Sequence, residues 1–247
     1  MFTPVAAEAV GLVVAGPFIG SFLGTAIDRI PRGEGYHWSR SRCRSCRMAL
    51  RAHDMVPVLS FLALRGRCRV CKAAIPSGLI AVEVSFSFFT ALTVTLVPTP
   101  AMAIGAALCW CLLSLSWFDA LLGRLPDALT LPLCIGGLVA AVLTGPSWID
   151  RVAGAVSGLA LPLLAFWIYR LRKGYDGLGI GDLKLFGAVG AWLGWEVLPF
   201  VVLLSSLLAV LYVLLLAADP RQSLPFGPFI AVTAWAAWIV MQRGLWS

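Results

Sequence analysis

Charged side chains are scarce in this sequence of 247 residues. Asp, Glu, Lys and Arg together make up 13% of it, whereas apolar residues make up 60%. Soluble globular domains carry about 25% charged and about 45–50% apolar residues. The scarcity of charge argues against a water-soluble domain and indicates an integral membrane protein.

Histidine is nearly absent as well. The only two, His37 and His53, lie in the polar segment that follows the first apolar stretch. We find no Ser-His or Cys-His arrangement and no His-Glu zinc-peptidase motif, so these hydrolytic mechanisms are not expected. A basic region before the first apolar stretch is also missing, and we therefore interpret residues 5–27 as a retained membrane span and not as a cleavable signal peptide.

Long apolar stretches, separated by Pro and Gly, recur along the whole chain. They predict an all-α integral membrane protein with about eight transmembrane helices. The sixth stretch is short for a span, and its boundary with the seventh, near Pro199, is the least distinct. The expected helices are 5–27, 78–97, 101–118, 128–145, 152–170, 183–197, 198–217 and 226–243.

The basic residues predict the orientation of these helices. If the helices cross the membrane in alternating directions, 17 of the 19 Lys and Arg residues fall on one side of it. The other two are Arg151 and Arg243. Because basic loops stay in the cytosol, both termini are expected outside and residues 29–77 inside. The predicted parts are a first helix (1–28), a cytosolic module (29–77) and a seven-helix membrane domain (78–247). The positive charge suits anionic lipid, and without interleaved aromatic residues it does not favour nucleic acid.

Four of the seven cysteines form two Cys-x2-Cys pairs in the basic segment, Cys43 with Cys46 and Cys68 with Cys71. Two such pairs can surround one ion with four thiolates, and a cytosolic location disfavours stable disulfides. We expect a structural zinc site, because four thiolates leave no open position for catalysis. Unliganded thiols and redox chemistry are the less favoured alternatives.

A few acids lie within or beside apolar stretches, where a carboxylate is costly and is a functional candidate by default. Asp119, Asp127 and Asp182 are all expected at the cytoplasmic face, and Glu83 lies inside the second predicted helix. Asp127 follows Pro126 and Asp182 opens a helix, so both also fit a helix N-cap. Asp119 ends an apolar helix, where the helix dipole disfavours an anion.

Two glycines, Gly179 and Gly181, lead into Asp182. Glycine allows unusual dihedral angles and close backbone approach, which a peptide substrate lying along this segment would need. Two interpretations of Lys184 stay open. Its positive charge favours ionisation of Asp182, or its side chain extends to lipid phosphates, which we prefer.

Two carboxylates from different helices can share one proton and hydrolyse a peptide without a covalent intermediate. The ionised acid takes a proton from water while the protonated acid polarises the scissile carbonyl. A transporter that uses the same acids for proton or cation coupling is the alternative. It predicts acids along a path across the bilayer, whereas these three gather at one face.

Five segments in order resemble the type IV prepilin peptidases, which are bifunctional leader peptidases and N-methyltransferases of bacterial membranes. The segments are GPFIGSFLGTAIDRIP (16–31), the double Cys-x2-Cys with DMVPVLSFLALRGRCRVC (54–71), AVEV (81–84), FDALLGRLPDALTLP (118–132) and GLGIGDLKLFGAVGAWLGW (177–195).

The resemblance implies an aspartic protease of the Gly-x-Gly-Asp type in the cytoplasmic (inner) membrane. It implies Asp119 and Asp182 as the catalytic pair, Gly179 and Gly181 as motif glycines, and Asp127 as the acid of the Leu-Pro-Asp segment. It also implies the four cysteines as zinc ligands, a prepilin or pseudopilin substrate cut after the glycine that ends its leader, and N-methylation with S-adenosylmethionine.

The sequence departs from the family pattern at three places. Gly24 and Asp176 stand where Asn and Glu are usual, and AVEV lacks a proline before its Val-Glu pair. None affects the proposed acid pair, but the Gly24 change bears on methyl transfer. Glu83 is the candidate for recognising the substrate amine, and a buried acid paired with Lys72 or an arginine is the alternative.

Overall fold

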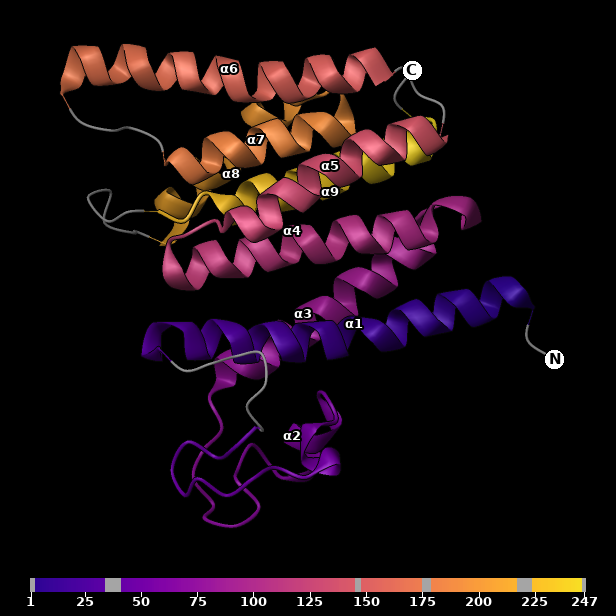
Figure 1. The fold of residues 1–247 in the computed structure, drawn as a ribbon, viewed down its shortest axis with the longest axis vertical. Helices are drawn as coiled ribbons and strands as arrows, with labels where there is room; N and C mark the ends of the chain where they lie inside the picture. The colour runs from indigo at the N-terminus through magenta and orange to yellow at the C-terminus, as the bar shows by residue number, and fades with distance from the viewer. Residues whose placement is uncertain (1–2, 34–40, 145–147, 175–178, 217–223, 246–247) are drawn as a thin grey trace. The chain divides into compact units, whose positions relative to one another are not determined.

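The computed structural model describes residues 3–33, 41–144, 148–174, 179–216 and 224–245, and these residues form helices with no β-strand. The chain divides into two compact units, unit 1 (residues 1–110) and unit 2 (residues 111–247). Figure 1 traces the chain from its N-terminus to its C-terminus. The α-helices are α1 (Pro4–Arg29), α2 (Leu59–Ala63), α3 (Ser77–Leu96), α4 (Met102–Leu122), α5 (Asp127–Thr144), α6 (Trp148–Lys173), α7 (Ile180–Leu193), α8 (Leu198–Leu216) and α9 (Gly227–Gln242).

Each of the eight predicted apolar stretches contains an α-helix, and among the α-helices of the described residues only the short α2 was not expected. Five regions, containing α1, α3, α4, α6 and α8, are long and apolar enough to cross a membrane. α5, α7 and α9 have 18, 14 and 16 residues, below the roughly 20 of a full span. Large apolar side chains of α8 such as Leu203 and Leu214 are exposed, as expected of a helix that faces lipid.

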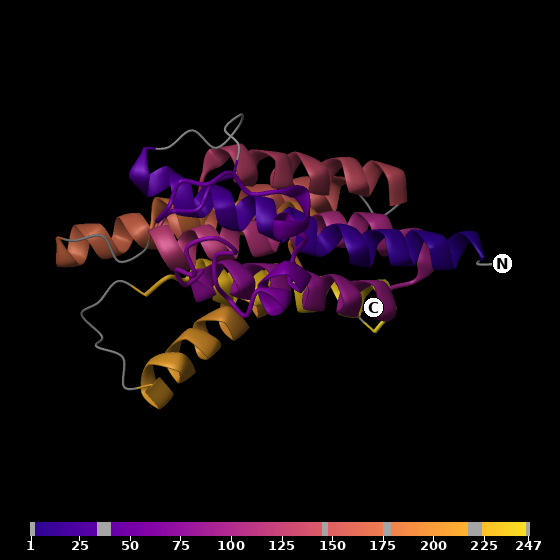
Figure 2. The same ribbon diagram turned by 90° about the horizontal axis from the view of Figure 1, so that it is seen from below.

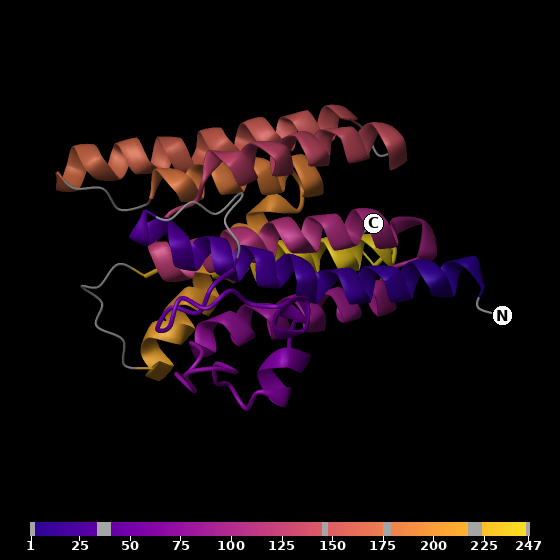
Figure 3. The same ribbon diagram turned by 60° about the horizontal axis from the view of Figure 1, so that its bottom comes forward.

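Unit 1 is built on the close packing of α1 against α3. Glycines on α1 allow the two backbones to approach: a Cβ on Gly20 would lie 3.0 Å from the Cβ of Phe86, and one on Gly16 2.7 Å from Oγ1 of Thr90. Small residues serve the same purpose in many membrane helix pairs. The segment between α1 and α3 folds beside this pair and carries the cysteines (Figure 3).

Unit 2 is organised around α7, which packs against α5, α6 and α9. All of its residues from Leu183 to Leu193 are buried except Lys184. Contact with α6 is close enough to require glycine, because a Cβ on Gly154 or Gly190 would overlap the backbone of the other. The views in Figures 1 and 2 show α6 along α7, with α8 running obliquely to the other helices of this unit. The sixth predicted helix, which was expected to be short for a span, is therefore the buried centre of unit 2.

Candidate active site

Asp119 lies near the C-terminal end of α4 and is 8% exposed. Its Oδ2 accepts a hydrogen bond of 2.7 Å from the backbone N–H of Gly227, the first residue of α9. A buried carboxylate is costly unless it is hydrogen-bonded, and the N-terminus of a helix favours negative charge. Asp119 is thus held between α4 and α9.

Asp182 lies in the first turn of α7. The negative charge of Asp119 acts on its carboxyl group, so the fold brings these two acids from different helices into electrostatic range. Two neighbouring carboxyl groups disfavour double ionisation and tend to share one proton. The fold therefore allows Asp119 and Asp182 to act as the pair predicted from the sequence. Their catalytic roles remain predictions.

The glycines before Asp182 lie close to other atoms of the protein. Gly179 has φ −71° and ψ 138°, ordinary extended angles that any residue adopts. A Cβ on it would lie 3.0 Å from Oδ2 of Asp182, and a Cβ on Gly181 would lie 3.0 Å from the Cβ of Leu125. The missing side chains therefore make room for the protein's own atoms, and unusual dihedral angles are not the reason for glycine here.

Asp127 opens α5, and its Oδ1 lies 2.7 Å from Nζ of Lys184. The two side chains are 58% and 44% exposed. Neither interpretation of Lys184 from the sequence included Asp127 as a partner. The ion pair joins the start of α5 to the second turn of α7. Asp127 forms an exposed ion pair, whereas Asp119 is buried and within electrostatic range of Asp182, which favours Asp119 as the first acid.

Sequence reasoning missed Gly227 entirely. The available signal was the segment Pro225-Phe226-Gly227-Pro228, in which a glycine lies between two prolines at the start of an apolar helix. Two residues that the sequence analysis singled out, His37 and Asp176, lie outside the described residues.

The four paired cysteines come together in unit 1. The Sγ atoms of Cys43, Cys46, Cys68 and Cys71 all lie within 4.8 Å of one another, and those of Cys43 and Cys71 are 3.7 Å apart. Four thiolates at tetrahedral zinc, with Zn–S bonds of about 2.3 Å, have edges of about 3.8 Å. The donor set and its spacing thus fit one metal ion.

Each cysteine pair lies in the same type of turn. The N–H of Cys43 bonds to the carbonyl of Met48, and that of Cys68 to the carbonyl of Ala73. Each turn contains a basic residue at positive φ, Arg47 at 58° and Lys72 at 60°. The segments CRSCRMA and CRVCKAA therefore form a structural repeat, with one half on each side of the predicted metal.

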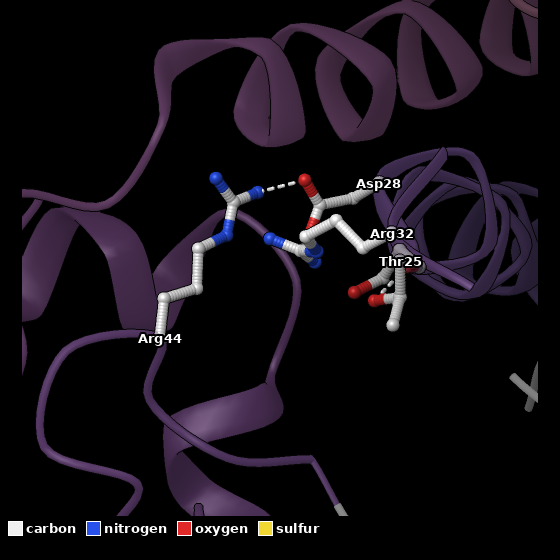
Figure 4. A network of polar contacts seen from close by, with 5 residues as sticks. Thr25, Asp28, Arg32 and Arg44 are labelled. Carbon is white, nitrogen blue, oxygen red and sulfur yellow. Dashed lines mark hydrogen bonds and ion pairs between the residues drawn. The ribbon is translucent and has the colours of Figure 1, made fainter. Parts of the chain in front are cut away.

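The arginine inside each cysteine pair contacts an acid. Arg44 forms an ion pair with Asp28 at the end of α1, which also pairs with Arg32 (Figure 4). Arg69 lies 3.2 Å from Asp54, which also accepts the N–H of Arg51 at 3.0 Å. This N–H, with the charge of Arg69, holds the pKa of the Asp54 carboxyl group below its ordinary value. The two ion pairs attach both turns to the rest of unit 1.

Glu83 of α3 accepts a 2.7 Å hydrogen bond from the N–H of Val58 through its Oε2. Val58 has φ 60° and ψ −52°, and Leu59 N–H bonds to Pro57 O at 2.6 Å, which together make a strained γ-turn. The acid is thus a backbone acceptor, a role that the predicted pairing with Lys72 or an arginine did not include.

A cavity of about 1070 Å³ lies within unit 1, and we call it the unit-1 cavity. Its lining comes from α1, the cysteine segment and α3. It combines apolar side chains such as Phe18 and Phe61 with acids and arginines, including Asp28, Arg44 and Glu83. This mixture suits a small molecule that carries charges of both signs and an apolar portion.

Comparison with known proteins gives consistent matches along the chain. Residues 14–97 match the bacterial peptidase A24 N-terminal domain, and residues 106–214 match the type IV leader peptidase family. No solved structure matches.

Several relatives carry the name prepilin leader peptidase/N-methyltransferase. The relative from Aeromonas hydrophila is 37% identical over 89% of this chain and 86% of its own length. One from Burkholderia pseudomallei is 36% identical over 89% and 81%, and one from Dickeya chrysanthemi is 36% identical over 96% and 94%. Because relatives this similar over most of both chains are named as peptidases and methyltransferases, the transporter alternative is not favoured. This chain belongs to the type IV leader peptidase family.

Proposed function

We propose that this protein removes the leader peptide from type IV prepilins or pseudopilins and then methylates the new N-terminus. The observation that carries the first activity is the approach of two acids in unit 2. Asp119 from α4 and Asp182 from α7 interact electrostatically, and Asp119 is fixed by Gly227. The names of the relatives supply the class of substrate.

In the proposed cleavage, one acid is ionised and the other holds a proton. The ionised carboxylate takes a proton from a water molecule as the water oxygen attacks the scissile carbonyl carbon, and the protonated acid donates a hydrogen bond to the carbonyl oxygen. The tetrahedral intermediate then collapses. Its C–N bond breaks, the amine takes up a proton, and the leader leaves as a carboxylate.

For methylation we propose S-adenosylmethionine as the methyl donor and the unit-1 cavity as its site. The donor carries a carboxylate, an ammonium and a sulfonium group beside an apolar purine, which matches the mixed lining of the cavity. In this proposal Glu83 of α3 recognises the substrate amine while its Oε2 also holds Val58. The N–C bond forms as the C–S bond breaks, and the amine loses one proton.

We further propose that zinc is the metal of the four-cysteine cluster and that its role is structural. Cys43, Cys46, Cys68 and Cys71 would satisfy all four positions of a tetrahedral ion. The metal would stabilise the two repeated turns, and with them the strained segment that Glu83 holds. It contributes no step to either reaction.

The proposed membrane arrangement has eight spans in the bacterial inner membrane, with both termini outside and the zinc module (29–77) in the cytosol. It follows from the distribution of Lys and Arg, which supports a cytosolic cysteine segment between the first helix (1–28) and the membrane domain (78–247). In this arrangement cleavage takes place at the cytoplasmic face.

The test is to incubate the purified protein in detergent with a synthetic prepilin and S-adenosylmethionine, and to record a mass spectrum of the products. The proposal predicts loss of the leader at its terminal glycine and one added methyl group on the mature N-terminus. Intact substrate would contradict the protease assignment, and processed but unmethylated product would contradict the methyltransferase assignment alone.

A further inference from the structure

The start of α9 makes direct contact with one acid of the proposed catalytic pair. The N–H of Gly227 donates to Oδ2 of Asp119 at 2.7 Å in a buried environment. α9 has 16 residues, long enough to have a positive end at its N-terminus, where a carboxylate is favoured. This contact favours the ionised form of Asp119, because an ionised carboxylate accepts such a bond more strongly than a neutral acid.

Position 227 also leaves no room for a side chain. A Cβ there would lie 2.9 Å from Oδ2, 3.0 Å from Cβ and 3.2 Å from Cγ of Asp119. These atoms stand close to the backbone of α4 and cannot move aside as the end of a long side chain would. Any residue other than glycine would therefore push the carboxylate of Asp119 away from its place.

The same segment contacts the helix that bears the second acid. The ring of Phe226 lies 6.2 Å from the ring of Phe186, which follows Asp182 by about one turn of α7. Phe226 also packs against Phe229 of α9, with ring centroids 6.3 Å apart. Residues 226–227 therefore touch both the acid of α4 and the helix that carries Asp182.

We infer that Gly227 is a positioning residue for leader cleavage, which holds the carboxyl group of Asp119 in its place at the start of α9. This inference rests on the proposed protease function and adds a residue of α9 that fixes one acid of the pair.

The test compares Gly227→Ala with Gly187→Ala, a glycine of α7 whose added Cβ would meet its nearest neighbours at 3.4 Å, an ordinary contact. Displacement of a reacting group by about 1 Å can cost about 100-fold in rate. We expect Gly227→Ala to lower kcat for leader cleavage by about 100-fold with KM unchanged. Gly187→Ala should keep both constants close to those of the unaltered protein.

Methyl transfer to an already processed peptide provides a readout that depends on unit 1. The rate of methyl transfer should be unchanged in Gly227→Ala, and so should the thermal melting temperature of the protein. Loss of methyl transfer along with cleavage would show a general folding defect and overturn the positioning role. As a second variant, Phe226→Leu keeps an apolar residue but removes the ring contact, and should lower kcat in the same direction by a smaller factor.

Unchanged kcat in both variants would overturn the inference. The proposed function would stand in that case, because the unaltered protein would still cleave. Absence of cleavage by the unaltered protein would instead contradict the proposed function itself.

Discussion

Gly181 of α7 packs directly against Leu125, the residue that precedes the Pro-Asp pair at the start of α5. A Cβ at position 181 would lie 3.0 Å from Cβ, 3.2 Å from Cδ1 and 3.4 Å from Cγ of Leu125. A few residues further on, Lys184 pairs with Asp127 across 2.7 Å. The two segments with acidic motifs are thus joined at two points, one apolar and one ionic, on either side of Asp182.

The first prediction concerns this apolar contact. Gly181→Ala should lower kcat for leader cleavage by about tenfold, because the added methyl group moves Asp182 away from Asp119 by a fraction of an ångström. Gly187→Ala, in the same helix, is the control and should cleave normally. Adding Leu125→Ala to Gly181→Ala removes Cγ and Cδ1 from the contact and should recover part of the lost rate. A normal rate in Gly181→Ala would show that the contact does not control the acid pair.

The second prediction concerns the metal. The purified protein should contain about one zinc ion per chain, measured by elemental analysis, and Cys43→Ser or Cys71→Ser should lose it. Cys134→Ser, which alters a cysteine of α5 outside the cluster, should retain it. Because the metal acts through the fold, its loss should lower the melting temperature while some leader cleavage survives. Metal-free protein with two disulfides would contradict this account.

The third prediction separates the two roles of Glu83. Glu83→Gln keeps an oxygen that can accept the Val58 N–H, but it removes the charge that would recognise an amine. We expect zinc content and leader cleavage to stay normal while methyl transfer falls by about 10-fold to 100-fold, since hydrogen bonds to charged groups contribute about 1.5–3 kcal/mol.

A matched variant tests the backbone role of Glu83. Val58→Gly relieves the positive φ of the γ-turn and should leave both activities intact. If Glu83→Gln methylates normally while Glu83→Ala does not, Glu83 serves only as the acceptor for Val58.

The sequence predicted the helices well, because lipid-facing helices are apolar on all sides and their runs end at Pro, Gly and charged residues. The stretch expected at 78–97 is observed at Ser77–Leu96, and the one expected at 183–197 is observed at Ile180–Leu193. Length and hydropathy could not show that α7 is the buried centre of unit 2. That depends on the close glycine contacts with α6, which involve residues far apart in the chain.

The candidate site was predicted in its residue types and only partly in its contacts. A carboxylate beside an apolar run is unusual enough to make Asp119 and Asp182 candidates, and the resemblance to the family implied them as a pair. The partner of Lys184 was not predicted because Asp127 is 57 residues away. Gly227 was missed for the same reason, since its contact with Asp119 spans 108 residues, and an isolated glycine gives no periodic signal.

The most direct test of the account is the rate of leader cleavage by three single variants, Asp119→Asn, Asp182→Asn and Asp127→Asn, measured in the same detergent with the same synthetic prepilin. Asn preserves the shape of each side chain and removes its ability to exchange a proton. The account predicts no detectable cleavage by the first two. It predicts a rate within about tenfold of normal for the third, because an exposed ion pair contributes about 1 kcal/mol or less. Cleavage by Asp119→Asn together with inactivity of Asp127→Asn would contradict it.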